Sequence, residues 1–482
     1  MPDKVRAIPP DPWKGRAERA EALYLGEYAM GGRTVTAVGE SVMPMARELA
    51  ETAPDWTAAL ASFRWLRDLE AEGTPLARSN AQALAVDWIA AHGRNLRRLH
   101  WAPGIAAIRL GHWLTCWNML SDDANHAVHD ALRLSISRHV RFLKLAQRGV
   151  RDPVDRTDVA LSLAFARAAT GNDERIAWDG VVAPDLAERL RHRPDHAVRI
   201  LCRLVQAREA AGERWPAEAA QAASALARDL ASWRLRAGLA TTRTGLPVPV
   251  EAVETVLAAF AADDPAPAEP GALRTALGDV TLVLDVSPDV ALEACGAFEM
   301  GDRSGRLVVS CGASEGGPPE LVEALRHRDA RSMFGADGGS LAPQTSPRSM
   351  RGAQGVREVG VETGLRGAPG ATHRRTLRLE RVEDRSALNG SDAFAGVPEG
   401  TLLRARFHLA PDVAVQEEAP GRIRLARAGT AWTFFCVDAP VSLEETAIFG
   451  DAMQASMQIV LEGKASGSAE WRWAFMRDPA TS

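Results

Sequence analysis

The sequence predicts a multi-domain α + β protein whose first half is helical and whose second half is an antiparallel β-sandwich. Apolar residues recur every three to four positions in the first half, the period of a helix that buries one face. After a proline-rich stretch the apolar period shortens to two, which is typical of strands. The length of 482 residues suits two or three domains at roughly 150 residues each.

The helical prediction begins at Trp56, Leu60, Phe63, Leu66 and Leu69, which share one helical face. Gly, Pro and Asp residues separate the segments that follow, which suggests stacked helical hairpins without an exact sequence repeat. Further helices are expected over 79–92, 104–119, 122–148, 154–169, 184–211, 216–237 and 249–262.

Residues 262–271 form the clearest linker, because their three prolines cannot continue a helix. Beyond it, alternating residues predict strands at 281–286, 306–311, 376–380, 403–409, 422–425, 433–437, 458–461 and 471–475. One stretch, 335–356, is rich in Gly, Ser and Pro and is expected to be a long mobile loop. We therefore divide the chain into an N-terminal extension, a helical domain, a linker and a β-sandwich domain, at 1–48, 49–262, 263–272 and 273–482.

Composition and charge narrow the functional classes. The 57 Lys and Arg residues against 62 Asp and Glu give a net charge of −5, which argues against a dedicated nucleic-acid binder. Only four of the basic residues are lysine, and guanidinium groups suit planar carboxylates and sulfates. No apolar run is long enough for a membrane helix, and the N-terminus shows no signal peptide. Five scattered cysteines favour neither a disulfide framework nor a zinc ribbon, so we expect a cytoplasmic protein.

Three short motifs match known functional patterns, but a structural role is favoured for each. Residues 312–316 fit the G-x-S-x-G pattern, but an ordinary loop is favoured over a hydrolase elbow in antiparallel surroundings. His126 and His129 could place two metal ligands on one helical face, yet a solvated face suits them better. The sequence Asn389-Gly390-Ser391 matches a glycosylation sequon and is expected to be a turn.

The helical half contains two candidate binding stretches. Trp101, Arg109, His112 and Trp113 could line a sugar cleft, where rings stack on pyranose faces and arginine clamps acidic groups; the alternative is a helix–helix core. The segment 192–196 begins His192-Arg193-Pro194, where proline suggests a helix start whose N–H groups could hold an anion. In the β half, His408 lies in the middle of a predicted strand, where a lone histidine is usually structural.

Several motifs occur in a characteristic order along both halves. In the β half they are Ala297-Phe298-Glu299, Gly305-Arg306 through Cys311-Gly312, His373-Arg374-Arg375, Leu388 with Gly390 and Asp392, Arg406-Phe407-His408-Leu409, Ser442 to Glu445, Gln458 to Leu461, and Trp471-Arg472-Trp473. In the helical half they are Phe63-x-Trp65-Leu66-Arg67, Asp87-Trp88-Ile89, Trp101-x-Pro103 and Arg109-x-x-x-Trp113. With this order and spacing the chain resembles the heparinase II/III-like proteins, in the version common in alphaproteobacteria, over most of residues 50–478.

The resemblance implies an incomplete α/α toroid joined to an antiparallel β-sandwich, and β-elimination at a uronic acid of a polysaccharide. In that chemistry one group neutralises the carboxylate, a Tyr or His removes the C5 proton, and an acid assists the leaving sugar. Three departures stand out: both tyrosines, Tyr24 and Tyr28, precede the toroid match; the Gly-Gly-His part of a toroid motif is missing or moved at the segment that contains His192; and Arg331 stands where a histidine is expected.

The sequence therefore leaves two explanations open. The chain is either a heparinase II/III-like polysaccharide lyase, weakened or inactive through these substitutions, or a non-catalytic carbohydrate-binding or envelope and exopolysaccharide assembly protein. In a working lyase, His408 or His192 would be the base and Arg331 or Arg109 would neutralise the carboxylate; an arginine cannot itself accept a proton near pH 7. A toroid glycoside hydrolase is a third class, which would need two carboxylates about 5–10 Å apart.

The expected partner is an acidic polysaccharide or oligosaccharide, with no nucleic acid and no membrane span. The substrate-binding prediction comprises Trp101, Arg109, His112, Trp113, Arg193 and Arg331. No cofactor is assigned; a divalent metal site that used both β-domain histidines of the family would lack one ligand at Arg331. The resemblance makes a periplasmic location an alternative to the cytoplasm, and the oligomeric state is left open.

Overall fold

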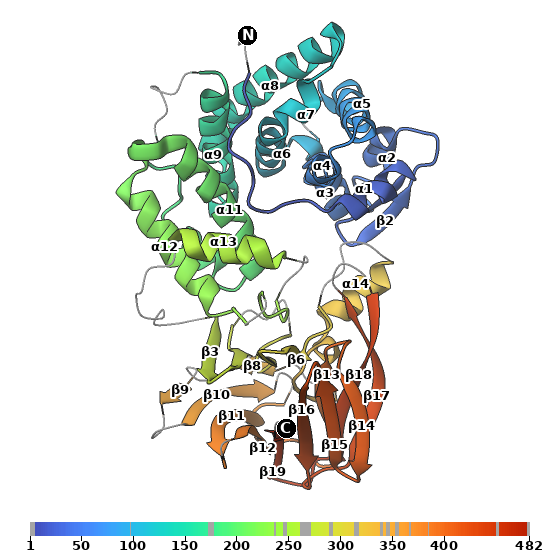
Figure 1. The fold of residues 1–482 in the computed structure, drawn as a ribbon, viewed down its shortest axis with the longest axis vertical. Coiled ribbons are helices and arrows are strands. Elements are labelled where there is room, and N and C mark those ends of the chain that lie inside the picture. Colours follow the sequence, from blue (N-terminus) through green and yellow to red (C-terminus); the bar gives the residue numbers. More distant parts are fainter. Residues whose placement is uncertain are drawn as a thin grey trace.

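The computed structural model describes residues 5–96, 98–171, 178–235, 238–243, 248–260, 271–288, 293–312, 318–337, 341–343, 348–351, 356–365, 368–383, 385–449 and 453–479. It consists of a helical part and a β part stacked along the long axis of the molecule (Figure 1). The predicted order, helices followed by antiparallel strands, is confirmed. Among the described residues no helix is both long and apolar enough to cross a membrane.

The helical part begins with elements that the sequence left as an extension. They are α1 (Ala17–Tyr24), β1 (Glu27–Met30), β2 (Arg33–Thr36) and α2 (Val42–Glu48). The helices that follow are α3 (Pro54–Ala61), α4 (Leu66–Glu72), α5 (Pro75–His92), α6 (Pro103–Thr115), α7 (Trp117–Ser121), α8 (His126–Ala146), α9 (Pro153–Ala169), α10 (Leu186–Leu190), α11 (Pro194–Ala211), α12 (Ala217–Ala231) and α13 (Val250–Phe260).

Local caps explain where several of these helices start. The side chain of Thr74 accepts a hydrogen bond from the backbone N–H of Ala77 at the start of α5, and Asp152 caps α9 in the same way. Proline occupies the first helical position of both helices and of α11. Where a single helix was expected over 184–211, the structure has α10 and α11, because residues between them leave the helical conformation before Pro194.

The β part is built from two antiparallel sheets. One has the order β14-β15-β16-β19-β12-β11-β10-β8, with β9 also paired to β10; the other has the order β17-β18-β13-β6-β5-β4-β3, with β7 also paired to β13. The strands of the first sheet are β8 (Leu341–Pro343), β9 (Arg348–Arg351), β10 (Val356–Leu365), β11 (Thr372–Val382), β12 (Arg385–Ala395), β14 (Ala414–Ala419), β15 (Arg422–Arg427), β16 (Thr430–Cys436) and β19 (Ala469–Arg477). Those of the second are β3 (Ala272–Leu277), β4 (Val280–Asp285), β5 (Phe298–Asp302), β6 (Gly305–Val309), β7 (Phe334–Ala336), β13 (Leu402–Leu409), β17 (Val441–Phe449) and β18 (Met453–Lys464); α14 (Pro319–Arg326) lies at the top of this sheet, beside the helical part (Figure 1).

Each part has its own hydrophobic core, one among the helices and one between the sheets. Buried polar contacts join the two parts. Arg243 pairs with Asp285 on β4 at 2.7 Å, and the backbone N–H of Thr241 donates to the carboxylate of Glu299 on β5 at 2.8 Å. The short segment that carries Arg243 and Thr241 therefore holds the helical part against the sheet.

Two sequence predictions are wrong in this region. The stretch 335–356 contributes β8 and β9 in its described residues, so it is not a loop throughout, because these segments add to the edge beside β10. The sequon Asn389-Gly390-Ser391 lies inside β12 and is not a turn. The proposed linker lies almost wholly outside the described residues, as do residues 313–317 of the G-x-S-x-G motif.

Candidate anion-binding site

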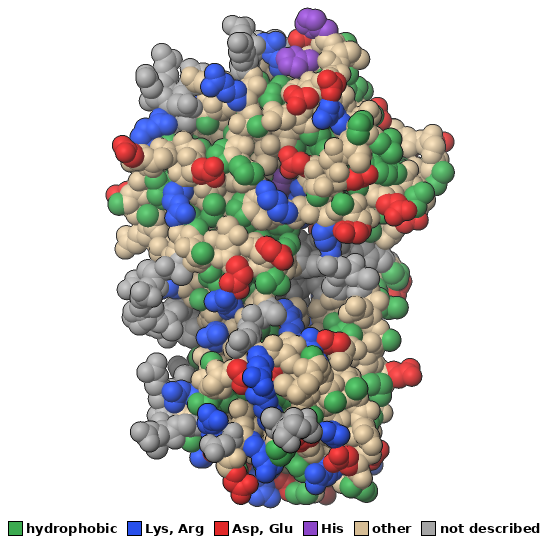
Figure 2. Space-filling view, viewed as in Figure 1, with side chains coloured by type: hydrophobic (Ala, Val, Ile, Leu, Met, Phe, Trp, Pro, Cys, Tyr) green, Lys and Arg blue, Asp and Glu red, His purple; other side chains and the backbone are tan. Residues whose placement is uncertain are grey.

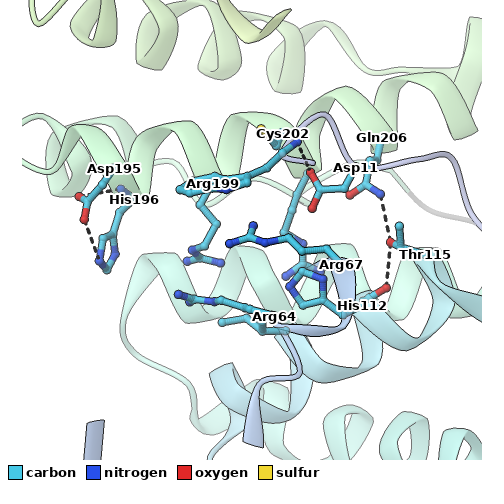
Figure 3. Close-up of a pocket in the computed structure, with 14 residues that line it drawn as sticks. Asp11, Arg64, Arg67, His112, Thr115, Asp195, His196, Arg199, Cys202 and Gln206 are labelled. Carbon is cyan, nitrogen blue, oxygen red and sulfur yellow. Dashed lines mark hydrogen bonds and ion pairs between the residues drawn. The ribbon is translucent and has the colours of Figure 1, made fainter. Parts of the chain in front are cut away.

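A narrow pocket inside the helical part is lined by four arginine side chains that the sequence did not assign to a site. It lies between α6, α11, the turn that joins α3 to α4, and the N-terminal segment before α1 (Figure 3). Its lining residues are Asp11, Trp13, Arg64, Arg67, Ile108, Gly111, His112, Thr115, Asp195, His196, Arg199, Cys202, Arg203 and Gln206. We call it the arginine pocket after Arg64, Arg67, Arg199 and Arg203.

Local structure brings these arginines to one place. Arg199 and Arg203 are four residues apart on α11, so both lie on the same helical face. Arg64 and Arg67 follow Phe63, whose positive φ of 57° ends α3 and redirects the chain into α4. This bend splits the helix that the apolar spacing predicted over 56–69.

Glycine at one position of α6 permits this close packing. A Cβ at Gly111 would lie 3.0 Å from the Nη2 of Arg203, closer than most side chains allow. The guanidinium of Arg203 therefore lies directly against the backbone of α6. It also donates to Ser162 Oγ at 2.6 Å.

One buried carboxylate holds two of the four arginines. Asp158 on α9 accepts from Arg199 at 2.8 and 3.1 Å and from Arg203 at 2.5 Å, and it is fully buried. Burial works to raise the pKa of Asp158, but the charges of Arg199 and Arg203 outweigh it and hold the pKa below its ordinary value. The Nε of Arg199 is buried without a hydrogen-bond partner among the described residues.

Exposure shows at which end the pocket opens. The side chain of His196 is 36% exposed, that of Arg199 14% and that of Arg203 8%. These three residues follow one another along α11, so the mouth lies at its N-terminal end, with His196, and Figure 3 shows Asp11 and Gln206 at the other end. The cavity volume is about 30 Å³, which leaves room for a small group such as a carboxylate.

Both histidines of the pocket are neutral at pH 7. Burial lowers the pKa of His196 to about 4, although the carboxylate of Asp195, 4.0 Å from its Nε2, acts to raise it. Burial, together with Arg67 and Arg64, also holds the pKa of His112 well below its ordinary value. The pocket thus combines cationic groups for an anion with neutral imidazoles that can accept a proton.

The remaining predicted residues of the helical half lie elsewhere. Trp101, Arg109 and Trp113 are buried among the helices, so the core interpretation describes their place. The guanidinium of Arg109 lies 3.9 Å from the ring centre of Trp88 and donates to His139 Nε2 at 2.8 Å. None of these residues lines the arginine pocket.

Of the residues predicted to bind substrate or to act as the base, His112 alone lines the pocket. Arg193 is exposed at the start of α11, and His192 lies against Gly271 where the β part begins. The mouth of the pocket, one turn along α11, therefore lies close to the β part. The structure does not bring His192 and His408 together in one described pocket.

His408 and Arg331 are buried in the β part. The Nε2 of His408 lies 2.9 Å from the carbonyl oxygen of Asp329, while its Nδ1 lies 3.1 Å from Thr446 Oγ1 and 3.5 Å from Cys311 Sγ. Burial lowers the pKa of His408 to about 4. Arg331 donates from Nε to the carbonyl of Thr242 at 2.7 Å, so it joins the helical part to the sheet.

The described residues contain no cluster of three or more His, Cys, Asp or Glu side chains that could hold a metal ion. His126 and His129 both lie at the exposed start of α8, where His126 approaches Asp130 at 3.4 Å. Figure 2 shows basic and acidic side chains interspersed over the visible face, without a large patch of one sign.

Sequence reasoning missed the four arginines and Asp11. The spacing of Arg64 with Arg67, and of Arg199 with Arg203, is that of one helical face. That signal was present, but surface ion pairs produce it equally. The segment 192–196 was flagged as an anion site, and its His196 does lie at the mouth of the pocket.

The comparisons with known proteins agree with this architecture. Residues 269–474 match the family model described as Heparinase II/III-like, C-terminal. A crystal structure of heparinase III matches with a TM-score of 0.66 and 12% identity, over 89% of this chain and 78% of that one. A mutant of a heparan sulfate lyase from Pedobacter heparinus matches with a TM-score of 0.58 and 13% identity, over 96% of this chain and 83% of that one. No curated protein sequence matches the chain.

Proposed function

From the family-model match over residues 269–474, we propose that the chain is a heparinase II/III-like protein that binds a uronate-containing acidic polysaccharide at the arginine pocket and cleaves it slowly by β-elimination. The main support for this proposal is that arginine side chains and a neutral histidine side chain lie together at the mouth of the pocket. Arg64 and Arg199 line the pocket beside His196, whose pKa of about 4 keeps it neutral at pH 7.

The size of the pocket supports a carboxylate as the group that enters. The enclosed space of about 30 Å³ admits a planar anion, while the sugar ring would stay outside, at the mouth. A carboxylate oxygen can accept from the buried Nε of Arg199, which has no hydrogen-bond partner among the described residues. Binding would thus satisfy a polar atom that is otherwise costly to bury.

The reaction follows from that placement. Arginine neutralises the carboxylate and so acidifies the adjacent C5–H bond. The neutral imidazole of His196 takes the C5 proton, the C–H electrons form the C4–C5 double bond, and the C4–O bond breaks. The departing glycosidic oxygen takes a proton from water. A base whose pKa is about 4 is weak, so slow turnover is expected.

The two tyrosines and His408 fit this role less well. Tyr28 is buried, and the hydroxyl of Tyr24 is hydrogen-bonded to Glu72. The ring nitrogens of His408 both face protein groups, as described above, so neither is open to a substrate. His196, with its partly exposed side chain, is the better candidate.

A non-catalytic carbohydrate-binding protein is the second candidate. The low pKa of His196 favours it, because the same burial that keeps the imidazole neutral also makes it a poor proton acceptor. Arg331 favours it too, since this residue stands where the resemblance leads us to expect a histidine and is committed to the carbonyl of Thr242.

One experiment separates the two candidates. Fluorescently labelled uronate oligosaccharides would be titrated into the protein, and absorbance near 232 nm, where the unsaturated product absorbs, would be followed with the same ligands. His196→Gln should keep binding and abolish the absorbance rise, while the matched change His192→Gln, just outside the pocket, should alter neither. Binding without any absorbance rise in the unmodified protein would establish the binding-only function; no binding of any uronate would overturn the proposal.

The arginines are tested in parallel. Arg199→Lys keeps the charge but loses the planar fork, so uronate affinity should fall about tenfold or more. Arg193→Lys is the matched control, because Arg193 is exposed outside the pocket. Equal effects of the two substitutions would remove the pocket from the proposal.

A further inference from the structure

The N-terminal segment before α1 closes the inner end of the arginine pocket. We call residues 5–16 the arm. Its backbone donates from Arg6 to Ala169 at 2.8 Å and from Ile8 to Leu114 at 3.2 Å, and Gln206 Nε2 donates to the carbonyl of Pro9 at 2.7 Å. The arm is therefore anchored to α9, to α6 and to α11.

Side chains fix the same segment against α4. The guanidinium carbon of Arg67 lies 4.8 Å from the ring centre of Trp13, and Trp13 is 5% exposed. The backbone N–H of Trp13 donates to Asp11 Oδ1 at 2.9 Å. This hydrogen bond fixes the Asp11 carboxylate in the pocket lining, at the end opposite His196 (Figure 3).

Asp11 is a carboxylate facing the two inner arginines. Burial raises its pKa, and the charges of Arg67 and Arg203 act in the opposite direction. The pocket thus has Arg64 and Arg199 toward its mouth and the carboxyl group of Asp11 at its floor.

We propose that Asp11 is a specificity-determining residue that restricts the arginine pocket to one planar, singly charged carboxylate and disfavours sulfate. The inference rests on the proposed function. A planar carboxylate places both oxygens toward the arginines near the mouth. A tetrahedral sulfate would direct a further oxygen toward the floor, and inorganic sulfate, with two charges, would meet about twice the Coulomb repulsion from Asp11.

Three probes separate charge from shape. Glucuronate is planar at its anionic group and singly charged, methyl sulfate is tetrahedral and singly charged, and inorganic sulfate is tetrahedral and doubly charged. Each would displace a labelled uronate oligosaccharide from the protein, and its inhibition constant would be measured. In the unmodified protein, glucuronate should displace the oligosaccharide at a lower concentration than either sulfate.

Two substitutions then test Asp11 itself. Asp11→Asn keeps an oxygen for the Trp13 N–H and removes the charge, so the inhibition constant of inorganic sulfate should fall about tenfold and that of glucuronate about threefold or less. Asp11→Ala also opens space and should improve methyl sulfate as well. Asp122→Asn, an exposed change of equal charge, should leave all three constants unaltered.

The outcomes distinguish this inference from the proposed function. If the unmodified protein binds glucuronate, but Asp11→Asn and Asp122→Asn give the same ratio of the sulfate to the glucuronate inhibition constant, the role of Asp11 is wrong. The proposal that the arginine pocket binds uronate would be unaffected. If the unmodified protein prefers sulfate, the role of Asp11 is also wrong. If no uronate binds at all, the proposed function fails and this inference fails with it. Near-ultraviolet circular dichroism would show that each variant is folded.

Discussion

Removal of the Asp158 charge should strongly destabilise the protein. In Asp158→Asn the carboxylate that holds Arg199 and Arg203 becomes an amide, which turns an NH₂ group toward one of two guanidinium groups. Because Asp158 is fully buried and these arginines are 14% and 8% exposed, water cannot replace the lost partner.

The size of the effect follows from this burial. Breaking a buried ion pair by removing one partner costs about 3–5 kcal/mol, since the remaining charge is left in a poorly solvated site. Asp158 accepts from two arginines, so we expect a loss of about 4 kcal/mol, within that range. A surface pair is the matched control: Asp185, 52% exposed and just before α10, pairs with Arg156 on α9, and Asp185→Asn should cost less than about 1 kcal/mol.

Urea unfolding at pH 7, followed by circular dichroism, measures both variants. The pH dependence adds a second check. The pKa of Asp158 is lowered in the folded state, so its contribution is complete above the ordinary value of 3.8 and is lost as the pH falls through the lower folded value. The difference between the unmodified protein and Asp158→Asn should therefore shrink below about pH 4. A loss under about 1 kcal/mol at pH 7, equal to that of Asp185→Asn, would refute the reasoning.

Three further predictions concern other parts of the molecule. The free energy of unfolding should fall as the pH drops from about 6.5 to 4, because the pKa of His408 is lowered to about 4 in the folded state and only the unfolded chain binds its proton in that window. In His408→Gln this fall, measured by urea titration, should be shallower. An unchanged slope would contradict the prediction. Gly390→Ala should lower the free energy of unfolding by about 1–3 kcal/mol or more, because its Cβ would lie 2.2 Å from the ring of Trp473. Gly149→Ala, with open space around it, should leave the free energy of unfolding nearly unchanged in the same urea titration. Arg331→Ala should lower the melting temperature without changing uronate affinity, because Arg331 joins the helical part to the sheet through the carbonyl of Thr242. Weaker uronate binding in a folded variant would show instead that Arg331 contributes to substrate binding.

The helical boundaries were predictable where apolar spacing and caps agree. The helix expected over 154–169 is α9, and the one expected over 79–92 lies within α5. Breaks inside a continuous apolar pattern could not be predicted. The positive φ of Phe63 splits α3 from α4, yet an aromatic residue at that position gives no turn signal.

Buried charged strands were equally hard to predict. All five residues of β5 are buried, among them Glu299 and Asp302, so no alternation of apolar and polar residues marks the strand. Glu299 is tolerated because Thr241, 58 residues earlier, donates to it. Sequence alone does not show which distant residue will satisfy a buried carboxylate.

The candidate site was the least predictable part, because its arginines come from segments far apart along the chain. Arg64 and Arg199 meet only after α3, α6 and α11 have packed together. Each arginine pair by itself has the spacing of an ordinary solvated helix face. They are identified as a site because they are buried together in the folded protein, and the local sequence pattern does not show this burial.

The arm also bears on the order of folding. Its hydrogen bond from Gln206 to Pro9 joins residues 197 positions apart, and contacts of such long sequence separation form late, since a long loop must close first. Residues 5–16 are synthesised long before α11, so they wait until α11 has been made before they can dock. Until then the inner arginines repel one another without the Asp11 carboxylate, so docking of the arm is expected to be a late, electrostatically assisted step that slows in high salt.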